Sequence, residues 1–165
     1  MIDEWLLQLS AVGRIALAMG LAACIGWERE KAARPAGLRT HMTVALAASL
    51  ITVLAEAMAH TAPREGFATD PTRVLEAVVT GVSFLGAGTI FASRDGSGVH
   101  GLTTAGSLLA TATIATAAGV HAYVIAVSGT ALLLLVLGVL RRLDVGVRKG
   151  EEAADTKAPA AAPST

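Results

Sequence analysis

Long apolar stretches alternate with short polar segments along most of this chain. A bilayer core is crossed by about 20 apolar residues in helical form, because lipid offers backbone N–H and C=O groups no partners outside the helix. Five stretches have about this length, at residues 5–27, 42–59, 74–92, 102–120 and 122–140. The pattern predicts an all-α, polytopic transmembrane helix bundle of about five helices. A short connection at 119–121 predicts that the last two helices form a hairpin.

Composition agrees with a membrane protein and excludes several other classes. Apolar residues make up 53% of the 165 residues and charged residues only 16%, which is unusual for a soluble domain. A soluble bundle of buried helices is the competing interpretation, but the chain offers no amphipathic helices to cover them. The formal net charge of zero gives no indication of a surface for nucleic acid. Cys24 is the only cysteine, so an internal disulfide and a cysteine zinc site are excluded.

The distribution of Lys and Arg predicts the orientation, because positively charged loops remain in the cytoplasm. After five crossings the first loop, the third loop and the tail share one side, and most basic residues lie there. We therefore expect the amino terminus outside and the carboxy terminus in the cytoplasm, with an uncleaved first segment because the start of the chain is acidic. Residues 1–142 are predicted to form the transmembrane domain and residues 143–165, rich in Ala, Glu and Pro, a disordered cytoplasmic tail.

Three charged residues, Arg14, Glu56 and Glu76, fall within the predicted spans. Each would cost about 2.5 to 3.5 kcal/mol at the centre of the bilayer. Glu56 and Glu76 lie near segment ends, where we expect them to reach water or headgroups. For Arg14 two interpretations remain open. Either it lies deep in a helix that begins near Trp5, or residues 5–13 form an interfacial stretch before a helix that begins later.

The polar segments between the helices hold the candidate functional residues. The segment 28–41 displays both charge signs around Pro35 and Gly37, which predicts a salt-bridged loop or a site for an ion or a phosphate-like group. Asp70 and Pro71 have the form of a helix start, with Asp70 as the N-cap and Arg73 paired with Asp70 or Glu76.

The segment Gly86-Ala87-Gly88 permits close helix packing or, alternatively, a break that exposes carbonyl groups to a cavity. No nucleophile lies beside a base and no nucleotide-binding loop is present, so we expect neither an enzyme nor a cofactor. The four histidines are spread over both predicted sides of the membrane, which makes a shared metal site unexpected.

Five ordered blocks resemble the MgtC/SapB family of bacterial inner-membrane proteins. They are IGWERE at 25–30, PAGLRTH at 35–41, DPTR at 70–73, FLGAGTI at 84–90 and GLTTA at 101–105. The resemblance implies a function in magnesium homeostasis, growth at low magnesium and, in pathogens, survival inside host cells. It implies regulation through membrane partners, such as the proton-translocating ATP synthase. A transporter or channel for a small ion such as Mg²⁺ is the alternative, and a homo-oligomer is a further expectation.

Matching the motifs of that family carries its functional positions over to this chain. They are Glu28, Arg29, Arg39, Thr40, Asp70, Arg73, Gly86, Gly88, Thr103 and Thr104. The sequence departs from the family pattern at Ser83, where a glycine is frequent, and after Ala105, where Leu-Trp often follows. The expected tail is also too short for the soluble domain of several family members, which puts regulation through such a domain in doubt.

Overall fold

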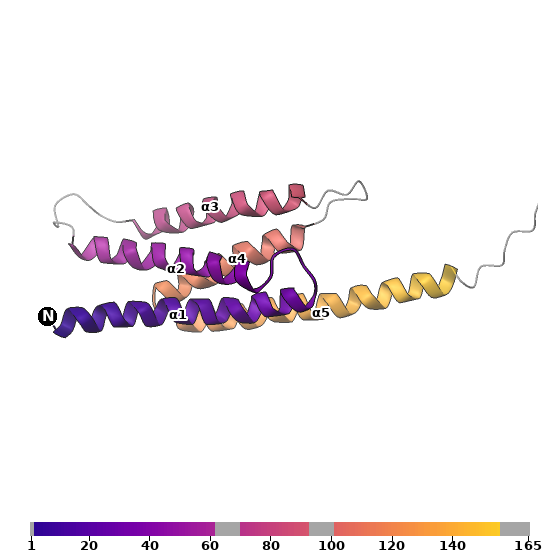
Figure 1. Ribbon diagram of the computed structural model, residues 1–165, viewed down its shortest axis with the longest axis horizontal. Coiled ribbons are helices and arrows are strands. Elements are labelled where there is room, and N and C mark those ends of the chain that lie inside the picture. Colours follow the sequence, from indigo (N-terminus) through magenta and orange to yellow (C-terminus); the bar gives the residue numbers. More distant parts are fainter. Residues whose placement is uncertain (1, 62–69, 93–100, 156–165) are drawn as a thin grey trace, which may run out of the picture.

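Five α-helices make up the described part of the protein. The computed structural model describes residues 2–61, 70–92 and 101–155 (Figure 1). The helices are α1 (Ile2–Lys31), α2 (Leu38–Thr61), α3 (Pro71–Ala92), α4 (Leu102–Gly119) and α5 (Tyr123–Asp155). The predicted all-α class with five helices is therefore confirmed.

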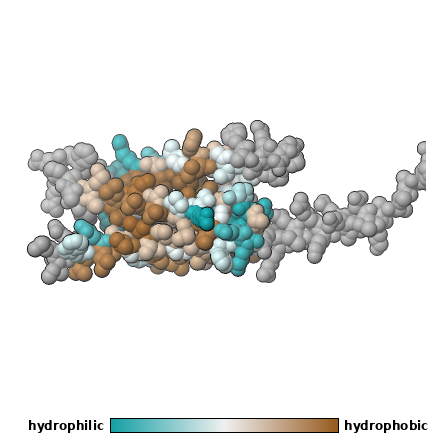
Figure 2. All heavy atoms as spheres, in the orientation of Figure 1, coloured by the Kyte–Doolittle hydropathy of each residue, from teal (hydrophilic) through white to brown (hydrophobic). Residues whose placement is uncertain are grey.

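Four of the helices are long and apolar enough to cross a membrane. These stretches are Trp5–Lys31, Leu38–Ala59, Thr72–Ile90 and Leu102–Gly119, whereas the apolar part of α5, Tyr123–Val139, is shorter. Figure 2 shows a hydrophobic band across the middle of the visible face, with hydrophilic residues where α1 ends and α2 begins. The helix α5 continues past residue 143, the expected start of the tail, and ends at Asp155. Residues 156–165 lie outside the described residues.

The central helix of the bundle is α4, which packs against each of the other four helices. In Figure 1, α1 and α5 lie side by side on one flank of the bundle and α3 lies on the opposite flank. The buried side of α4 consists mainly of small residues, such as Ser107, Thr111, Ala112 and Ala115. Small side chains let helix backbones approach one another closely, which is the main source of helix association in lipid.

Two of the helices end in a left-handed residue that is not glycine. After α1, Ala33 has a φ of 51° and its N–H donates to Glu30 O, while Arg34 N donates to Arg29 O. After α4, His121 has a φ of 65° and the same pair of bonds joins His121 N to Ala118 O and Ala122 N to Ala117 O. Both ends are Schellman motifs, in which glycine is the usual left-handed residue. The second one turns the chain into α5 and confirms the predicted hairpin.

Replacing Ala33 with glycine is expected to stabilise the protein by about 0.5 to 1 kcal/mol. The left-handed conformation costs a residue with a Cβ about 1 to 2 kcal/mol, and the greater freedom of glycine in the unfolded chain offsets part of that gain. Unfolding of the detergent-solubilised protein, followed by circular dichroism, measures the difference. The control Ala16→Gly, at an exposed position inside α1, should instead destabilise by about 1 kcal/mol. A loss of stability for both variants would contradict the strain at Ala33.

Two sequence interpretations are corrected by the helices. The helix α1 is continuous from Ile2, so the structure has no separate segment before Arg14 and the later helix start is wrong. The helix α3 likewise runs without interruption through Gly86 and Gly88, so the proposed break is wrong. A Cβ at Gly86 would lie 3.3 Å from the Cβ of Ala105, which identifies close packing of α3 on α4 as the role of that glycine.

Candidate functional site

Polar groups gather around two buried arginines, Arg14 and Arg29, which lie toward opposite ends of the bundle. The first set, which we call the Arg14 cluster, comprises Arg14, Glu56, Gly119 and His121. The second set, which we call the Arg29 network, comprises Arg29, His41, Thr104 and Ser107. The two arginines are separated by about 22 Å along α1 at the helical rise of 1.5 Å per residue.

The Arg14 cluster connects three helices through one guanidinium group. Arg14 is 7% exposed, and its Nη1 donates to Glu56 Oε2 at 2.5 Å and to the carbonyl oxygen of Gly119 at 2.5 Å. The same nitrogen lies 3.4 Å from Nδ1 of His121. Glu56 therefore does not simply extend to the interface, as the sequence suggested, but forms an ion pair between α1 and α2.

The position of Arg14 also suits the end of α4. Gly119 is the last residue of α4, where carbonyl groups lack helical N–H partners and the helix dipole is negative. A guanidinium group at this place satisfies such a carbonyl and interacts favourably with the dipole. A Cβ at Gly119 would lie 2.9 Å from the Cβ of Thr52, so a glycine is required for the close approach of α2 and α4.

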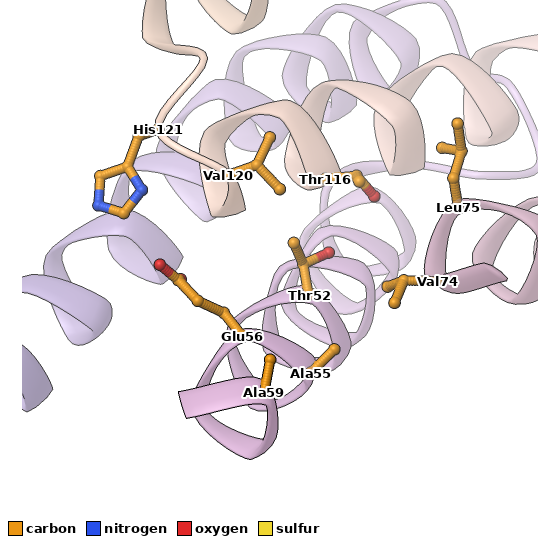
Figure 3. A pocket seen from close by; sticks show the side chains of 9 residues that line it. All are labelled: Thr52, Ala55, Glu56, Ala59, Val74, Leu75, Thr116, Val120 and His121. Carbon is orange, nitrogen blue, oxygen red and sulfur yellow. The ribbon is translucent and has the colours of Figure 1, made fainter. Parts of the chain in front are cut away.

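A pocket opens beside the Arg14 cluster, between α2, α3 and the end of α4 (Figure 3). Its volume is about 290 Å³. It is lined by Thr52, Ala55, Glu56, Ala59, Val74, Leu75, Thr116, Val120 and His121. The side chain of Thr116 is buried, and its hydroxyl oxygen has no hydrogen-bond partner among the described residues. The pocket is suited to a small, mainly apolar group that carries a hydrogen-bonding atom.

The Arg29 network connects α1, α2 and α4 at the other end. Arg29 is 4% exposed and donates from Nη2 to Thr104 Oγ1 at 2.9 Å. The hydroxyl of Ser107 donates to Thr104 O at 2.8 Å and lies 3.2 Å from Nε2 of His41, which is fully buried. Nδ1 of His41 lies 2.9 Å from Gly37 O, and because a carbonyl only accepts, this nitrogen carries a proton. Among the described residues no carboxylate forms an ion pair with Arg29.

At the junction of α1 and α2, a carboxylate accepts a backbone hydrogen bond and two glycines permit close contact. Oε2 of Glu30 accepts a hydrogen bond of 2.9 Å from the amide of Leu38, the first residue of α2, and so satisfies a free N–H at the positive end of that helix. A Cβ at Gly37 would lie 2.9 Å from this carboxylate oxygen. A Cβ at Gly26 would lie 2.7 Å from Cα of Leu38, so the two helices touch backbone to backbone.

Comparison with known proteins identifies the family. Residues 15–145, which include the whole Arg29 network and every residue of the Arg14 cluster except Arg14 itself, match the MgtC family. The chain belongs to the MgtC family. This membership, together with the helices long enough to cross a membrane, makes it a multi-pass membrane protein.

Three relatives illustrate the match. The chain is 34% identical over 131 residues to YhiD of Escherichia coli (strain K12), which covers 79% of this chain and 60% of YhiD. It is 35% identical over 130 residues to an uncharacterized protein of Haemophilus influenzae, and this match covers 78% of this chain and 54% of the relative. It is also 35% identical over 123 residues to protein MgtC of Brucella abortus (strain 2308), where the match covers 74% of this chain and 48% of the relative. The chain thus spans about half to three fifths of these relatives. No solved structure matches it significantly.

The motif residues of the MgtC family do not form one site. Arg29 and Thr104 are hydrogen-bonded to one another, although they are far apart in the sequence. Glu28 is half-buried, and Thr103 is exposed on the first turn of α4. Arg39 and Thr40 are exposed on the first turn of α2. Gly88 faces open space, because an added Cβ would meet no atom within 4 Å.

The other predicted residues, Asp70 and Arg73, lie at the opposite end of the bundle, at the start of α3. Oδ1 of Asp70 accepts hydrogen bonds from the hydroxyl of Thr72 at 2.7 Å and from its amide at 2.9 Å, which confirms the N-cap. These two bonds lower the pKa of the exposed Asp70 carboxyl below its usual value, the hydroxyl having the larger effect. Within the described residues, Arg73 forms no ion pair with Asp70 or Glu76.

Sequence reasoning singled out Arg14 and Glu56 separately but did not pair them, and it missed the contributions of His41, Ser107 and His121. A signal for the first pair was present. Two opposite charges inside apolar segments that follow one another in the chain are expected to pair, because neither is stable alone in lipid. Nothing comparable marks His41 or Ser107, whose partners depend on how the helices are rotated.

Proposed function

We propose that this MgtC-family protein functions in the bacterial inner membrane in adaptation to low magnesium, and that it regulates other membrane proteins without conducting ions or catalysing a reaction. The relative YhiD carries a name that proposes a magnesium transporter, which supports the link to magnesium. The family resemblance adds regulation of partners such as the proton-translocating ATP synthase.

The main support for the proposal is that the buried charges of the described bundle are positive. The interior of the described bundle holds two guanidinium groups, Arg14 and Arg29, whereas its carboxylates are half-buried or exposed. Guanidinium groups repel a divalent cation, and Mg²⁺ pathways use oxygen ligands, especially carboxylates. In the described residues, no three His, Cys, Asp or Glu side chains are grouped as metal ligands. The bundle is therefore a poor conduit for Mg²⁺.

A groove between α4 and α5 supports contact with a transmembrane helix of a partner protein. It has a volume of about 430 Å³ and is lined mainly by small and apolar residues, namely Gly106, Leu109, Ala110, Thr113, Ile114, Ala117, Ile125 and Gly129. Small residues along one face are the usual site of close helix association in membranes. Gly106 is exposed, and an added side chain there would meet no atom of this chain within 4 Å.

Vesicles reconstituted with the purified protein are expected to remain impermeable to Mg²⁺. The measurement is the fluorescence of a magnesium indicator trapped inside, after Mg²⁺ is added outside. A magnesium ionophore provides the positive control, and protein-free vesicles give the background. Influx that depends on the protein and disappears in Glu56→Gln would contradict regulation and support the alternative of a Mg²⁺ channel.

A strain that lacks the protein is expected to grow normally with ample magnesium and poorly when magnesium is scarce. Wild-type protein and the variant Gly20→Leu should restore growth, because Gly20 is exposed on α1 and has free space around it. Gly106→Leu should fail, because the new side chain fills the groove against the partner helix. Crosslinking in membranes should recover a partner with wild-type protein and Gly20→Leu but not with Gly106→Leu. If Gly20→Leu and Gly106→Leu restored growth equally and recovered the crosslinked partner equally, the groove would not be the contact site.

The proposed orientation has the amino terminus outside and the carboxy terminus in the cytoplasm, as the basic residues indicate. A fluorescent protein fused to the carboxy terminus should therefore fluoresce, and alkaline phosphatase at the same place should be inactive. The reverse pair of results would overturn this orientation.

A further inference from the structure

The guanidinium of Arg29 lies at the amino-terminal end of α4 with most of its donors unused. Its single hydrogen bond within the described residues runs from Nη2 to the hydroxyl of Thr104, in the first turn of α4. Nε of Arg29 is buried and has no partner. Burying a charge without a counter-charge is costly, so a group that brings a negative charge to Arg29 would be strongly favoured.

The first turn of α4 adds further donors at the same place. The hydrogen bonds along α4 begin at Ala105, whose backbone amide donates to Gly101 O at 2.9 Å. No side chain caps the helix, because Gly101 stands at the N-cap in a left-handed conformation with a φ of 93°. The preceding amides of this first turn thus point out of the helix end, where the dipole is positive. Such a helix start binds anions.

The charges around Arg29 also favour an anion. Among the described charged groups, Arg34 repels the Arg29 guanidinium and Glu28 attracts it, and the repulsion is the larger of the two effects. Arg34 and Thr103, which adjoin these groups, are exposed, so the site lies near the surface of the described bundle. Within the described residues, the buried guanidinium of Arg29 and the start of α4 therefore form a positive region that Glu28 offsets only in part.

We propose that Arg29, Thr104 and the amino-terminal amides of α4 form a binding site for a phosphate group. A phosphate offers several oxygens in the geometry that a guanidinium group and a helix start recognise together. In this site the phosphate supplies a counter-charge that no described residue provides to Arg29 through an ion pair, and it ties α1 to α4. A free phosphate and the headgroup of an anionic phospholipid share this chemistry.

Two measurements on the full-length protein in a neutral detergent separate these sources. Calorimetric titration with inorganic phosphate tests free phosphate. Native mass spectrometry tests the retention of phosphatidylglycerol against phosphatidylcholine, whose choline cancels the charge of its phosphate. One of the two probes is expected to bind, and Arg29→Gln should weaken that binding by about tenfold or more, as the loss of a charge-assisted hydrogen bond predicts.

Matched variants keep the test decisive. Thr104→Val removes only the hydroxyl that holds Arg29 and should weaken binding by about fivefold, whereas Thr113→Val, exposed on the same helix, should leave it unchanged. Lys31→Gln removes an exposed positive charge two positions from Arg29 and should change binding less than about twofold. The proposal is overturned if neither probe binds, if Lys31→Gln weakens binding as much as Arg29→Gln, or if a folded Thr104→Val binds like wild type.

Discussion

Replacing Arg14 with methionine is expected to lower the free energy of unfolding by about 3 kcal/mol. The substitution leaves the Glu56 carboxylate without its ion-pair partner and the last carbonyl of α4 without a donor. Removing one partner of a buried pair costs about 3 to 5 kcal/mol, and the lower end applies because the Glu56 side chain is 36% exposed. Unfolding of the protein in mixed micelles by increasing dodecyl sulfate measures the difference.

A second substitution distinguishes the loss of the pair from the loss of packing. Arg14→Met combined with Glu56→Gln removes the uncompensated charge and should recover about 1 to 2 kcal/mol relative to Arg14→Met alone. Lys31→Met, at an exposed position of the same helix, removes a surface cation–π contact with Trp27 and should change stability by less than about 1 kcal/mol. A double variant no more stable than Arg14→Met would show that the ion pair contributes little.

Gly26→Ala is expected to destabilise the protein by about 3 kcal/mol and to separate α1 from α2. The added Cβ would lie 2.7 Å from Cα of Leu38 and 3.1 Å from Gly37 O, and backbone atoms cannot rotate away as a flexible side chain can. Overpacking in a tightly packed interior typically costs about 1 to 3 kcal/mol, and contact with backbone places this variant at the upper end. The same unfolding measurement applies.

The matched control is Gly20→Ala on the same helix. No atom lies within 4 Å of the position of its new Cβ, so the better helix propensity of alanine should stabilise the protein by up to about 1 kcal/mol. Opposite signs for two identical chemical changes, six residues apart, would be direct evidence for the close contact at Gly26. Equal effects would contradict it.

The helices were predictable because lipid imposes a simple requirement on the sequence. A stretch of sufficient apolar length must form a helix to satisfy its own backbone, and no tertiary information is needed to find it. The cap at Asp70 was also predictable, because its side chain and the amide and hydroxyl of Thr72, two residues later, are neighbours in the chain. The hairpin after Gly119 belongs to the same class, since only a short connection is available there.

The candidate site was less predictable because its contacts join distant parts of the chain. Arg14 and Glu56 are 42 positions apart, and Arg29 and Thr104 are 75 apart. Their pairing depends on the relative shift and rotation of three helices, which are decided by small residues and not by any local pattern. The left-handed conformations of Ala33 and His121 could not be predicted from the sequence either, because neither residue type indicates a helix end.

The central place of α4 has a consequence for how the protein is made. A ribosome delivers α1, α2 and α3 to the membrane before the helix against which all of them pack has been synthesised. The first two helices can associate with one another, but α3 contacts α2 only slightly and has its main partner in α4. During synthesis α3 must therefore remain in lipid, or with the insertion machinery, until α4 arrives, and the bundle closes only after α4 has been synthesised.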